Sequence, residues 1–337
     1  MSDNRVEPSP AERDGALRIT VLSDAPDGPP GIDRLREHAE IALAHNEASL
    51  RAALPGSRIL VVTDFRTEAL KAAWDAADRL EWIHATSAGV DQLMFDALIE
   101  SDIPVTNAQG IFDRNIAEYV LTQILIFAKD SANNLAYQQQ HRWVHRDTET
   151  IEAKHLLVVG AGSIGHRIGR LCRAAGMRVS GVARRAKDGD DVFDSIHAQD
   201  DLDALLPDAD YVVVAAPLTD STEGLFNAAR FAAMAAHARF INIGRGAIVN
   251  TEDLVAALAA NEIAGAALDV FETEPLPADH PLWDMDNVLI SAHMAGDFIG
   301  WREALIEQFL ANLARWRAGE NLFNRVNKRH GYAPGGA

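Results

Sequence analysis

The sequence predicts an α/β protein built from two doubly wound parallel sheets. Three observations predict it. Short apolar segments alternate with helical segments along most of the 337 residues, a glycine-rich turn at Gly160–Gly165 directly follows one apolar segment, and the alternation then resumes. Strands separated by helices favour a parallel sheet with helices on both faces. We therefore expect a Rossmann dinucleotide-binding domain, residues 108–296, inserted into a flavodoxin-like substrate domain formed by residues 1–107 and 297–337.

The first domain is predicted from the alternation between residues 17 and 106. Its expected strands are Leu17–Leu22, Ala39–Leu43, Arg58–Val62, Glu81–Ala85 and Pro104–Thr106. Helices are expected between them, for instance at Glu68–Ala77 and Gln92–Glu100. A last amphipathic helix, Gly300–Ala318, is expected to return and pack on this domain.

The glycine-rich turn has the spacing of a phosphate-binding loop. Leu156–Val159 is a buried strand by its composition, and Gly160, Gly162 and Gly165 follow it in the pattern G-x-G-x-x-G. The first glycine turns the chain, the second lets the backbone approach a pyrophosphate, and the third lets the next helix pack close to the strand. By itself the pattern also fits an ordinary glycine-rich turn.

The elements on either side of the turn favour a dinucleotide site. A helix is expected at Ser163–Ala175, with Ser163 and Ile164 in its first turn, and a second strand is expected at Arg178–Val182. The positive end of the helix dipole then points at the phosphates. We therefore expect Ser163 and Ile164 to contact the cofactor together with the three glycines.

The end of the second strand predicts which cofactor is used. A chain that binds NAD usually carries Asp or Glu there to hold the ribose hydroxyls. This chain has Arg184 and Arg185 instead, and no carboxylate before Asp188. Paired guanidinium groups bind a 2′-phosphate that a carboxylate would repel. NADP(H) is therefore the preferred cofactor and NAD(H) a possible one, although both arginines could also be solvated loop charges.

Composition excludes several function classes. The formal net charge of −18 argues against nucleic acid or an anionic membrane as the main partner. No apolar run is long enough to span a bilayer, and Met1–Gly15 lacks the apolar core of a signal peptide. The single cysteine, Cys172, fits a cytoplasmic protein and a small buried apolar side chain.

The alternation that follows the glycine turn predicts the rest of the second domain. Its expected strands are Tyr211–Ala215, Phe240–Ile243, Ala266–Val270 and Val288–Ser291. Helices are expected at Asn227–Ala235 and Thr251–Ala260, the latter with Thr251 as its N-cap. Before the glycine turn, a long apolar helix at Asn115–Lys129 is expected to connect the domains.

A more polar segment, Asn133–His145, follows the connecting helix and is a candidate homodimer surface. His141 and His145 are four residues apart, a spacing that metal ligands on a helix also have. No acidic or cysteine partner lies at a suitable spacing, so we interpret them as solvated surface histidines. We see no cluster of metal ligands in the sequence.

Three polar stretches each follow a predicted strand of this second domain. They are Asn242–Gly246 with Arg245 between glycines, Leu268–Leu276 with several carboxylates, and Ser291–Gly296 with His293. Each alone is consistent with a solvated turn. Since the carboxyl ends of parallel strands meet at one edge of a sheet, together they form a candidate active site beside the nicotinamide.

These stretches resemble the D-isomer-specific 2-hydroxyacid dehydrogenases over roughly residues 17–322. N-x-G-R-G, D-V-F-E-x-E-P-L and H-x-A-G occur in the order and approximate spacing of that family. Thr86–Asp91 resembles its substrate-anchoring loop and Ala216–Thr219 its loop beneath the nicotinamide. The arginine pair is similar to that of the family's NADPH-using glyoxylate and hydroxypyruvate reductases. The chain departs from the family in having Ala292 rather than proline before the histidine.

The resemblance implies a role for individual residues. The implied catalytic residues are Arg245, Glu274 and His293. Further implied cofactor contacts are Pro217, Thr222, Ile243, Asp269 and His293. The implied substrate contacts are Ser87, Ala88, Gly89, Arg245 and Phe65. Asp269 could equally be a buried structural acid, and Phe65 could equally be a core or rim aromatic.

The chemistry of 2-keto acid reduction needs these residue types. His293 supplies a proton to the carbonyl oxygen, because histidine titrates near neutral pH. Glu274 orients the imidazole; Glu272 competes for this role, but Glu274 directly precedes proline as the family's catalytic acid does. Arg245 holds the substrate carboxylate, with the backbone N–H groups of Ala88 and Gly89 on its other side.

The leading hypothesis is therefore an NADPH-dependent 2-ketoacid reductase that works in reverse as a D-2-hydroxyacid dehydrogenase. Formate dehydrogenase is an alternative within the family, but its histidine pairs with glutamine rather than with an acid such as Glu274. The other class considered is a nicotinamide-sensing binding protein without turnover, since the family includes transcriptional corepressors. The intact set of arginine, acid and histidine and the acidic net charge argue against that class.

Overall fold

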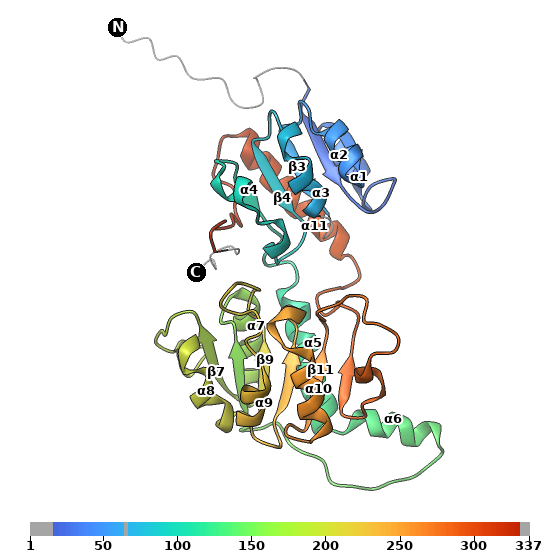
Figure 1. Cartoon of the computed structure of the whole chain (residues 1–337), viewed down its shortest axis with the longest axis vertical. Coiled ribbons are helices and arrows are strands. Elements are labelled where there is room, and N and C mark those ends of the chain that lie inside the picture. The colour runs from blue at the N-terminus through green and yellow to red at the C-terminus, as the bar shows by residue number, and fades with distance from the viewer. Residues whose placement is uncertain (1–15, 64–66, 331–337) are drawn as a thin grey trace. The chain divides into compact units, whose positions relative to one another are not determined.

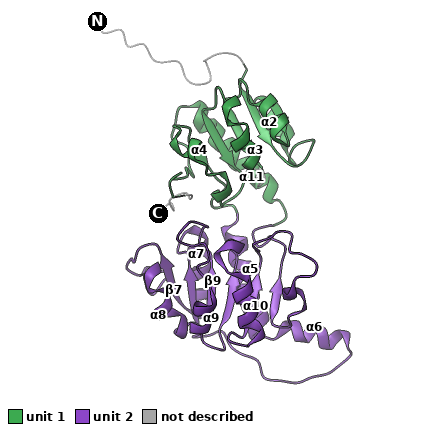
Figure 2. Cartoon of the chain, viewed as in Figure 1, with its two compact units in different colours: residues 1–111, 298–337 green, residues 112–297 purple. Residues whose placement is uncertain are grey.

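The computed structural model of the chain describes residues 16–63 and 67–330. Two compact units divide the chain (Figure 2): Met1–Ile111 with Phe298–Ala337 form unit 1, and Phe112–Asp297 form unit 2. Each unit contains one sheet whose strands all run parallel, with helices on both faces. The predicted fold class is confirmed. The predicted domain boundaries, at 107/108 and 296/297, lie close to the boundaries between these units.

Unit 1 has the strand order β2-β1-β3-β4-β5, which is the flavodoxin-like order. Its strands are β1 (Arg18–Leu22), β2 (Glu40–Ala44), β3 (Ile59–Val62), β4 (Trp82–Ala85) and β5 (Val105–Thr106). Its helices are α1 (Ile32–Arg36), α2 (Glu47–Ala53), α3 (Thr67–Ala72), α4 (Asp96–Glu100) and α11 (Trp301–Arg317). All five predicted strands are present.

The two faces of this sheet are covered by different helices because side chains alternate along each strand. Ile19, Ile59 and Trp82 lie in register on one face, where they pack against α1 and α11. The other face packs against α2, α3 and α4. The C-terminal helix α11 thus returns to unit 1, as predicted, and buries Phe309 and Leu313 there.

Unit 2 has the order β12-β11-β10-β9-β6-β7-β8 (Figure 1). Its strands are β6 (His155–Val159), β7 (Arg178–Ala183), β8 (Ile196–Ala198), β9 (Tyr211–Val214), β10 (Arg239–Asn242), β11 (Gly265–Leu268) and β12 (Val288–Ile290). The order runs outward in both directions from β6, so the carboxyl ends of β6 and β9 form the crevice where dinucleotides bind in such sheets.

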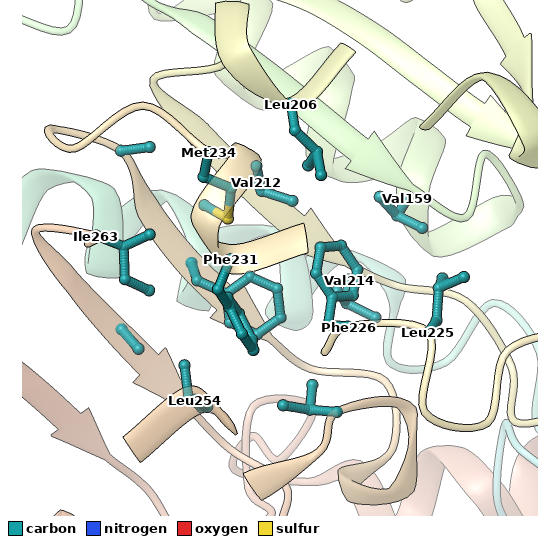
Figure 3. Packing of buried hydrophobic residues seen from close by; sticks show 14 of the residues in the cluster. Val159, Leu206, Val212, Val214, Leu225, Phe226, Phe231, Met234, Leu254 and Ile263 are labelled. Carbon is teal, nitrogen blue, oxygen red and sulfur yellow. The ribbon is translucent and has the colours of Figure 1, made fainter. Parts of the chain in front are cut away.

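Two helical layers sandwich the sheet of unit 2. Its helices are α5 (Asp113–Ala128), α6 (Ser131–Gln139), α7 (Ser163–Ala174), α8 (Leu202–Leu205), α9 (Ala228–Ala233) and α10 (Thr251–Ala259). Leu156 and Val158 face α5 and α7, whereas Leu157 and Val159 face α8, α9 and α10. Figure 3 shows the second of these cores, in which Phe231 of α9 and Phe226 gather with strand residues such as Val212 and Val214.

The structure corrects three details of the prediction. The helix expected at Gln92–Glu100 is interrupted, because Phe95 has an extended backbone and its ring packs edge-on against Trp74, 5.2 Å between centroids. The helix expected at Glu68–Ala77 correspondingly ends at Ala72 and continues only as a short 3-10 turn. Strand β8 was not predicted at all; its parallel pairing with β7 at the edge of the sheet defines it.

The N-cap of α10 is also different from the predicted one. Asn250, not Thr251, caps this helix, because the Asn250 side chain accepts a hydrogen bond from the N–H of Asp253 at 3.0 Å. Thr251 is already the first helical residue. Asparagine is at least as good an N-cap as threonine. The helix is therefore capped by a polar side chain as predicted, but the capping residue is Asn250, one position before the predicted one.

Several smaller expectations concern single side chains. Cys172 is fully buried, and burial raises the pKa of its thiol to about 12, so it behaves as an apolar group. His141 and His145 are exposed and lie beyond the end of α6. Within the described residues no group of three or more metal-ligating side chains gathers, and no helix there is long and apolar enough to cross a membrane.

Candidate active site

The glycine turn of unit 2 leaves backbone exposed at the end of β6. Gly160 has φ of 110°, and a Cβ on it would lie 2.5 Å from the backbone of Ala215. A Cβ on Gly165 would lie 2.0 Å from the Gly160 oxygen, so α7 packs directly on the turn. A Cβ on Gly162 would meet nothing within 4 Å. The turn therefore has an open approach at its middle glycine, which is what a pyrophosphate requires.

The first turn of α7 completes this phosphate cradle. The backbone N–H groups of Ser163 and Ile164 donate no hydrogen bond within the described residues. The Ser163 hydroxyl, in contrast, donates to the carboxylate of Asp113, the first residue of α5. We therefore expect Ser163 to meet a cofactor through its backbone rather than its hydroxyl.

Two other predicted cofactor residues, Thr222 and Ile243, are buried within unit 2. The Thr222 hydroxyl donates to the Pro217 oxygen at 2.7 Å and accepts the N–H of Thr219 at 2.8 Å. These contacts fix the loop that follows β9, and any contact between these residues and a cofactor stays a prediction.

Arg184 and Arg185 follow β7 immediately and are both exposed. The end of β7 is the place where such folds bind the adenosine ribose. The structure therefore presents two guanidinium groups at the expected position on the sheet edge.

Arg245 lies in a turn after β10 that the preceding residues hold rigidly. Asn242 accepts the N–H of Gly244 and donates to the Arg245 oxygen, both at 3.0 Å. A Cβ on Gly246 would lie 1.8 Å from the backbone of Phe271, so this turn packs directly against the loop that follows β11. The arginine is thereby placed beside the loop that carries the acidic residues.

Glu274 and His293 are in direct contact. His293 Nδ1 lies 2.8 Å from Glu274 Oε2, and Glu274 Oε1 accepts the N–H of Phe271 at 2.9 Å. Both side chains are about one-third exposed, at 32% for His293 and 35% for Glu274, so the pair is accessible to a ligand. Glu272 is exposed and makes no such contact in the described structure.

The charges around Glu274 keep it ionised. Burial pushes the pKa of this carboxyl upward, but the hydrogen bonds from His293 and Phe271 and the charges of His293 and Arg245 outweigh it, and the pKa is lower than usual. His293 and Arg245 therefore both act electrostatically on Glu274 at one edge of the sheet.

Asp269 anchors the loop that carries His293. Its buried carboxylate accepts the N–H groups of Met294 and Ala295 at 2.9 Å each, and also the Ser291 hydroxyl. Its backbone oxygen accepts the N–H of His293, whose φ is 50°. The geometry favours the structural interpretation of Asp269, and a contact with the nicotinamide stays a prediction.

Tyr119 extends this network from α5. Its hydroxyl lies 2.6 Å from Ser291 Oγ, and because Ser291 donates to Asp269, Tyr119 is the donor. Burial, aided by the charge of Asp269, raises the pKa of Tyr119 to about 12 and keeps its proton in place. The His293 loop is thus held by a chain of three side chains from separate elements.

The loop that is predicted to anchor the substrate belongs to unit 1 and follows β4. Ser87 Oγ donates to the Gly89 oxygen at 2.6 Å, and Asn107 donates to the Ala88 oxygen at 2.6 Å. The N–H groups of Ala88 and Gly89 donate to no acceptor among the described residues. Phe65 lies outside the described residues.

A Rossmann sheet with an open glycine turn, and an arginine beside an acid–histidine pair at its carboxyl edge, define a nicotinamide-dependent oxidoreductase. Residues 121–295 match the family described as D-isomer specific 2-hydroxyacid dehydrogenase, NAD binding domain. The chain belongs to this family.

Individual relatives extend over most of the chain. A glyoxylate reductase of Thermococcus onnurineus is 29% identical over 312 residues, which cover 88% of this chain and 92% of the relative. The solved family member from Aeromonas salmonicida has a TM-score of 0.80 and 30% identity, over 93% of this chain and 100% of that one. An NADPH-dependent glyoxylate/hydroxypyruvate reductase of Sinorhizobium meliloti, solved with NADP and sulfate, has a TM-score of 0.80 and 26% identity, over 94% of this chain and 100% of that one. The present chain is thus an oxidoreductase of the 2-hydroxyacid dehydrogenase type that binds a nicotinamide cofactor.

Sequence reasoning missed the residues that support the site. Asn242 bonds within its own turn, and it has a sequence signal because it precedes the glycine–arginine pair. Tyr119, Ser291 and Asp113 instead make their contacts through tertiary structure. Supporting hydrogen bonds of this kind join residues far apart in the chain, such as Tyr119 and Ser291, 172 positions apart.

Proposed function

We propose that this chain catalyses the NADPH-dependent reduction of 2-keto acids to D-2-hydroxy acids and the reverse oxidation. The observation that carries the proposal is the contact between His293 and the ionised Glu274, in a loop packed beside the Arg245 turn. Such a set can donate a proton and bind a carboxylate, which are the two tasks that the protein must perform in this reaction.

The proposal assigns a role to each of these residues. Bound NADPH supplies the hydride for the carbonyl carbon. His293 donates a proton to the carbonyl oxygen through the ring nitrogen that does not face Glu274, and takes it back in the oxidation. Glu274 holds the ring in one orientation and stabilises its charged form. Arg245 binds the substrate carboxylate with two parallel hydrogen bonds. Ser87, Ala88 and Gly89 of unit 1 stay predicted substrate contacts.

In this proposal each unit has one task. Unit 2 binds the dinucleotide through its glycine turn, and unit 1 contributes the loop that selects the substrate. Glyoxylate and hydroxypyruvate are the first candidate substrates. The Thermococcus onnurineus relative is named as a glyoxylate reductase, and the Sinorhizobium meliloti relative as a glyoxylate/hydroxypyruvate reductase. The direct test is a screen of 2-keto acids for oxidation of NADPH and NADH. Absence of turnover with every acid would favour the binding-protein alternative.

The preference for NADPH rests on Arg184 and Arg185, and the structure of the Sinorhizobium meliloti relative with NADP supports it. We expect Arg184→Ala combined with Arg185→Ala to raise the dissociation constant for NADPH by at least about tenfold, since charged hydrogen bonds to the 2′-phosphate are lost. NADH, which lacks that phosphate, should bind almost as before. Titration of the reduced nicotinamide fluorescence measures both constants.

The control for this pair removes two arginines elsewhere. Arg34→Ala with Arg36→Ala changes the net charge equally but lies in unit 1, where the arginines pair with Glu307 and Asp33. This control should bind both cofactors like the wild type. Equal losses of NADPH and NADH binding in the Arg184 and Arg185 variant would contradict the assignment.

The proposed assembly is a homodimer formed through α6 and the segment that follows it. Figure 1 shows α6 standing out from the rest of unit 2, and its Leu135 is 63% exposed while Trp143 is 99% exposed. Large exposed apolar side chains of this kind are typical centres of protein interfaces.

We expect Trp143→Ala to weaken dimerisation by at least about tenfold, because tryptophans at interface centres carry much of the binding energy. Sedimentation equilibrium measures the dissociation constant. Trp283→Ala, a half-exposed tryptophan elsewhere in unit 2, is the matched control. A monomeric wild type, or a dimer of unchanged affinity in Trp143→Ala, would refute this interface.

A further inference from the structure

The loop that carries Arg184 and Arg185 is an ordered hairpin. The Lys187 N–H donates to the Ile196 oxygen at 2.9 Å, and the Asp190 N–H donates to the Phe193 oxygen at 3.0 Å. The chain therefore turns back at residues 190–193 and enters β8. The two arginines lie at the base of this hairpin rather than in a free loop.

Three aspartates of the hairpin face one side of α7. Asp190 pairs with His166 at 2.9 Å, Asp191 with Arg170 at 3.1 Å, and Asp194 with Arg173 at 2.7 Å. Positions 166, 170 and 173 are spaced so that they share one face of a helix. The hairpin is thus aligned along the helix whose first turn forms the phosphate cradle.

His166 is the member of this row that reaches the cradle itself. Its Nδ1 lies 3.0 Å from the Gly162 oxygen and its Nε2 lies 2.9 Å from Asp190 Oδ2. Both partners only accept hydrogen bonds, so both bonds form together when each ring nitrogen carries a proton. One imidazole therefore connects the middle glycine of the turn with the arginine hairpin.

Asp190 is held firmly at the other end of this connection. Its Oδ1 accepts the N–H groups of Val192 and Phe193 at 2.8 Å each. The hydrogen bond from the Phe193 N–H contributes most to lowering the pKa of Asp190 to about 2; burial opposes it, and Val192 and His166 lower the pKa further. Asp190 is therefore ionised at neutral pH, where it faces His166.

The packing beneath the hairpin tip leaves it little freedom. Phe193 is fully buried, and its ring stands edge-on to His166 with 4.8 Å between centroids. A Cβ on Gly181 would lie 3.1 Å from this ring, and a Cβ on Gly169 would lie 3.3 Å from it. Two glycines, one on β7 and one on α7, therefore make the space that seats the hairpin tip.

We propose that Asp190 and His166 are positioning residues for cofactor selectivity, which hold the arginine hairpin at a fixed spacing from the pyrophosphate turn. The inference rests on the proposed NADPH preference. The 2′-phosphate and the pyrophosphate belong to one ligand, so their binding groups must keep the separation that the ligand dictates. A preset spacing spares the free-energy cost of ordering the hairpin on binding. NADH lacks the 2′-phosphate that the arginines are proposed to bind, so it gains less from that spacing.

The test uses a substitution that removes the hydrogen bond between Asp190 and His166 but keeps the hairpin turn at residues 190–193. Asp190→Asn keeps an oxygen for the Val192 and Phe193 N–H groups but turns an amide NH₂ toward His166. We expect the dissociation constant for NADPH to rise about fivefold while that for NADH changes less than about twofold. His166→Gln should give the same pattern. Asp191→Asn, the same change one residue along on an exposed pair, should leave both constants unchanged.

The outcomes separate this inference from the proposal it depends on. A wild type that binds NADPH and NADH equally overturns the cofactor preference and the inference together. A wild type that prefers NADPH, with both variants keeping the ratio of the two constants, overturns the positioning role alone. Parallel losses for both cofactors, or a lowered melting temperature with an unchanged ratio, would show a merely structural contact.

Discussion

His293→Asn is expected to lower kcat by about two to four powers of ten, the usual contribution of a positioned general acid. The dissociation constant for NADPH should stay within about twofold, because the glycine turn and α7 are untouched. Asparagine is the sharper replacement, since His293 has φ of 50° and asparagine tolerates this left-handed region better than alanine. Steady-state oxidation of NADPH with the best 2-keto acid measures kcat, and fluorescence titration measures cofactor binding.

The two neighbouring glutamates provide the internal control for this experiment. Glu274→Gln should lower kcat as well, because the charge that orients and stabilises the protonated His293 is lost. Glu272→Gln makes the same change two residues earlier, on an exposed side chain, and should leave kcat as it is. Near-normal turnover in His293→Asn, or equal effects of the two glutamate changes, would remove the pair from the mechanism.

Much of the fold could be predicted because its strands are short, apolar and separated by helices. Leu156–Val159 and Tyr211–Val214 are buried on both faces, so they read as continuous apolar runs. β8 has no such signal, since only Ile196 of its three residues is buried. The interrupted helix near Phe95 could not be predicted either, because its cause is a ring contact with Trp74, a residue outside the helical segment.

The candidate site could be predicted only to the level of the sheet edge. Parallel pairing brings the ends of β10, β11 and β12 side by side, so Arg245, Glu274 and His293 were expected together. The sequence could not decide between Asp269 as cofactor contact and as structural acid. That distinction depends on the N–H groups of Met294 and Ala295, which turn toward Asp269 only in the folded loop.

Acid is expected to destabilise unit 1 through a single buried histidine. His84 of β4 is fully buried beside Phe309, with rings 5.4 Å apart, and burial lowers its pKa to about 3. Its Nδ1 lies 2.8 Å from the hydroxyl of Thr106, which also accepts the indole N–H of Trp82. The Thr106 oxygen can accept a second hydrogen bond as well as donate one, so the direction of its bond with Nδ1 depends on the tautomer of His84. His84 Nε2 has no hydrogen-bond partner in the part of the chain that is described.

The direction of the pH dependence follows from the different pKa values of His84 in the folded and unfolded states. The native His84 stays neutral down to about pH 3, whereas the unfolded chain binds a proton near the ordinary histidine pKa of 6.5. Below pH 6.5 the unfolded state thus binds more protons, and the free energy of unfolding falls as the pH falls toward 3. At pH 4.5 this one group costs roughly 2.5 kcal/mol, a large part of the stability of an ordinary domain.

Replacing His84 by asparagine isolates this contribution from that of the many carboxylates. Asparagine can hydrogen-bond to Thr106 as donor or as acceptor but does not titrate, so the difference in unfolding free energy between pH 7 and pH 4.5 should shrink by roughly 2.5 kcal/mol. Urea unfolding followed by tryptophan fluorescence is suitable, since Trp82 and Trp316 are buried in the same unit. His38→Asn, at an exposed position of unit 1, is the matched control and should retain the pH dependence of the wild type. If His84→Asn and the wild type lost equal stability on acidification, the buried histidine would not be the group that responds to acid.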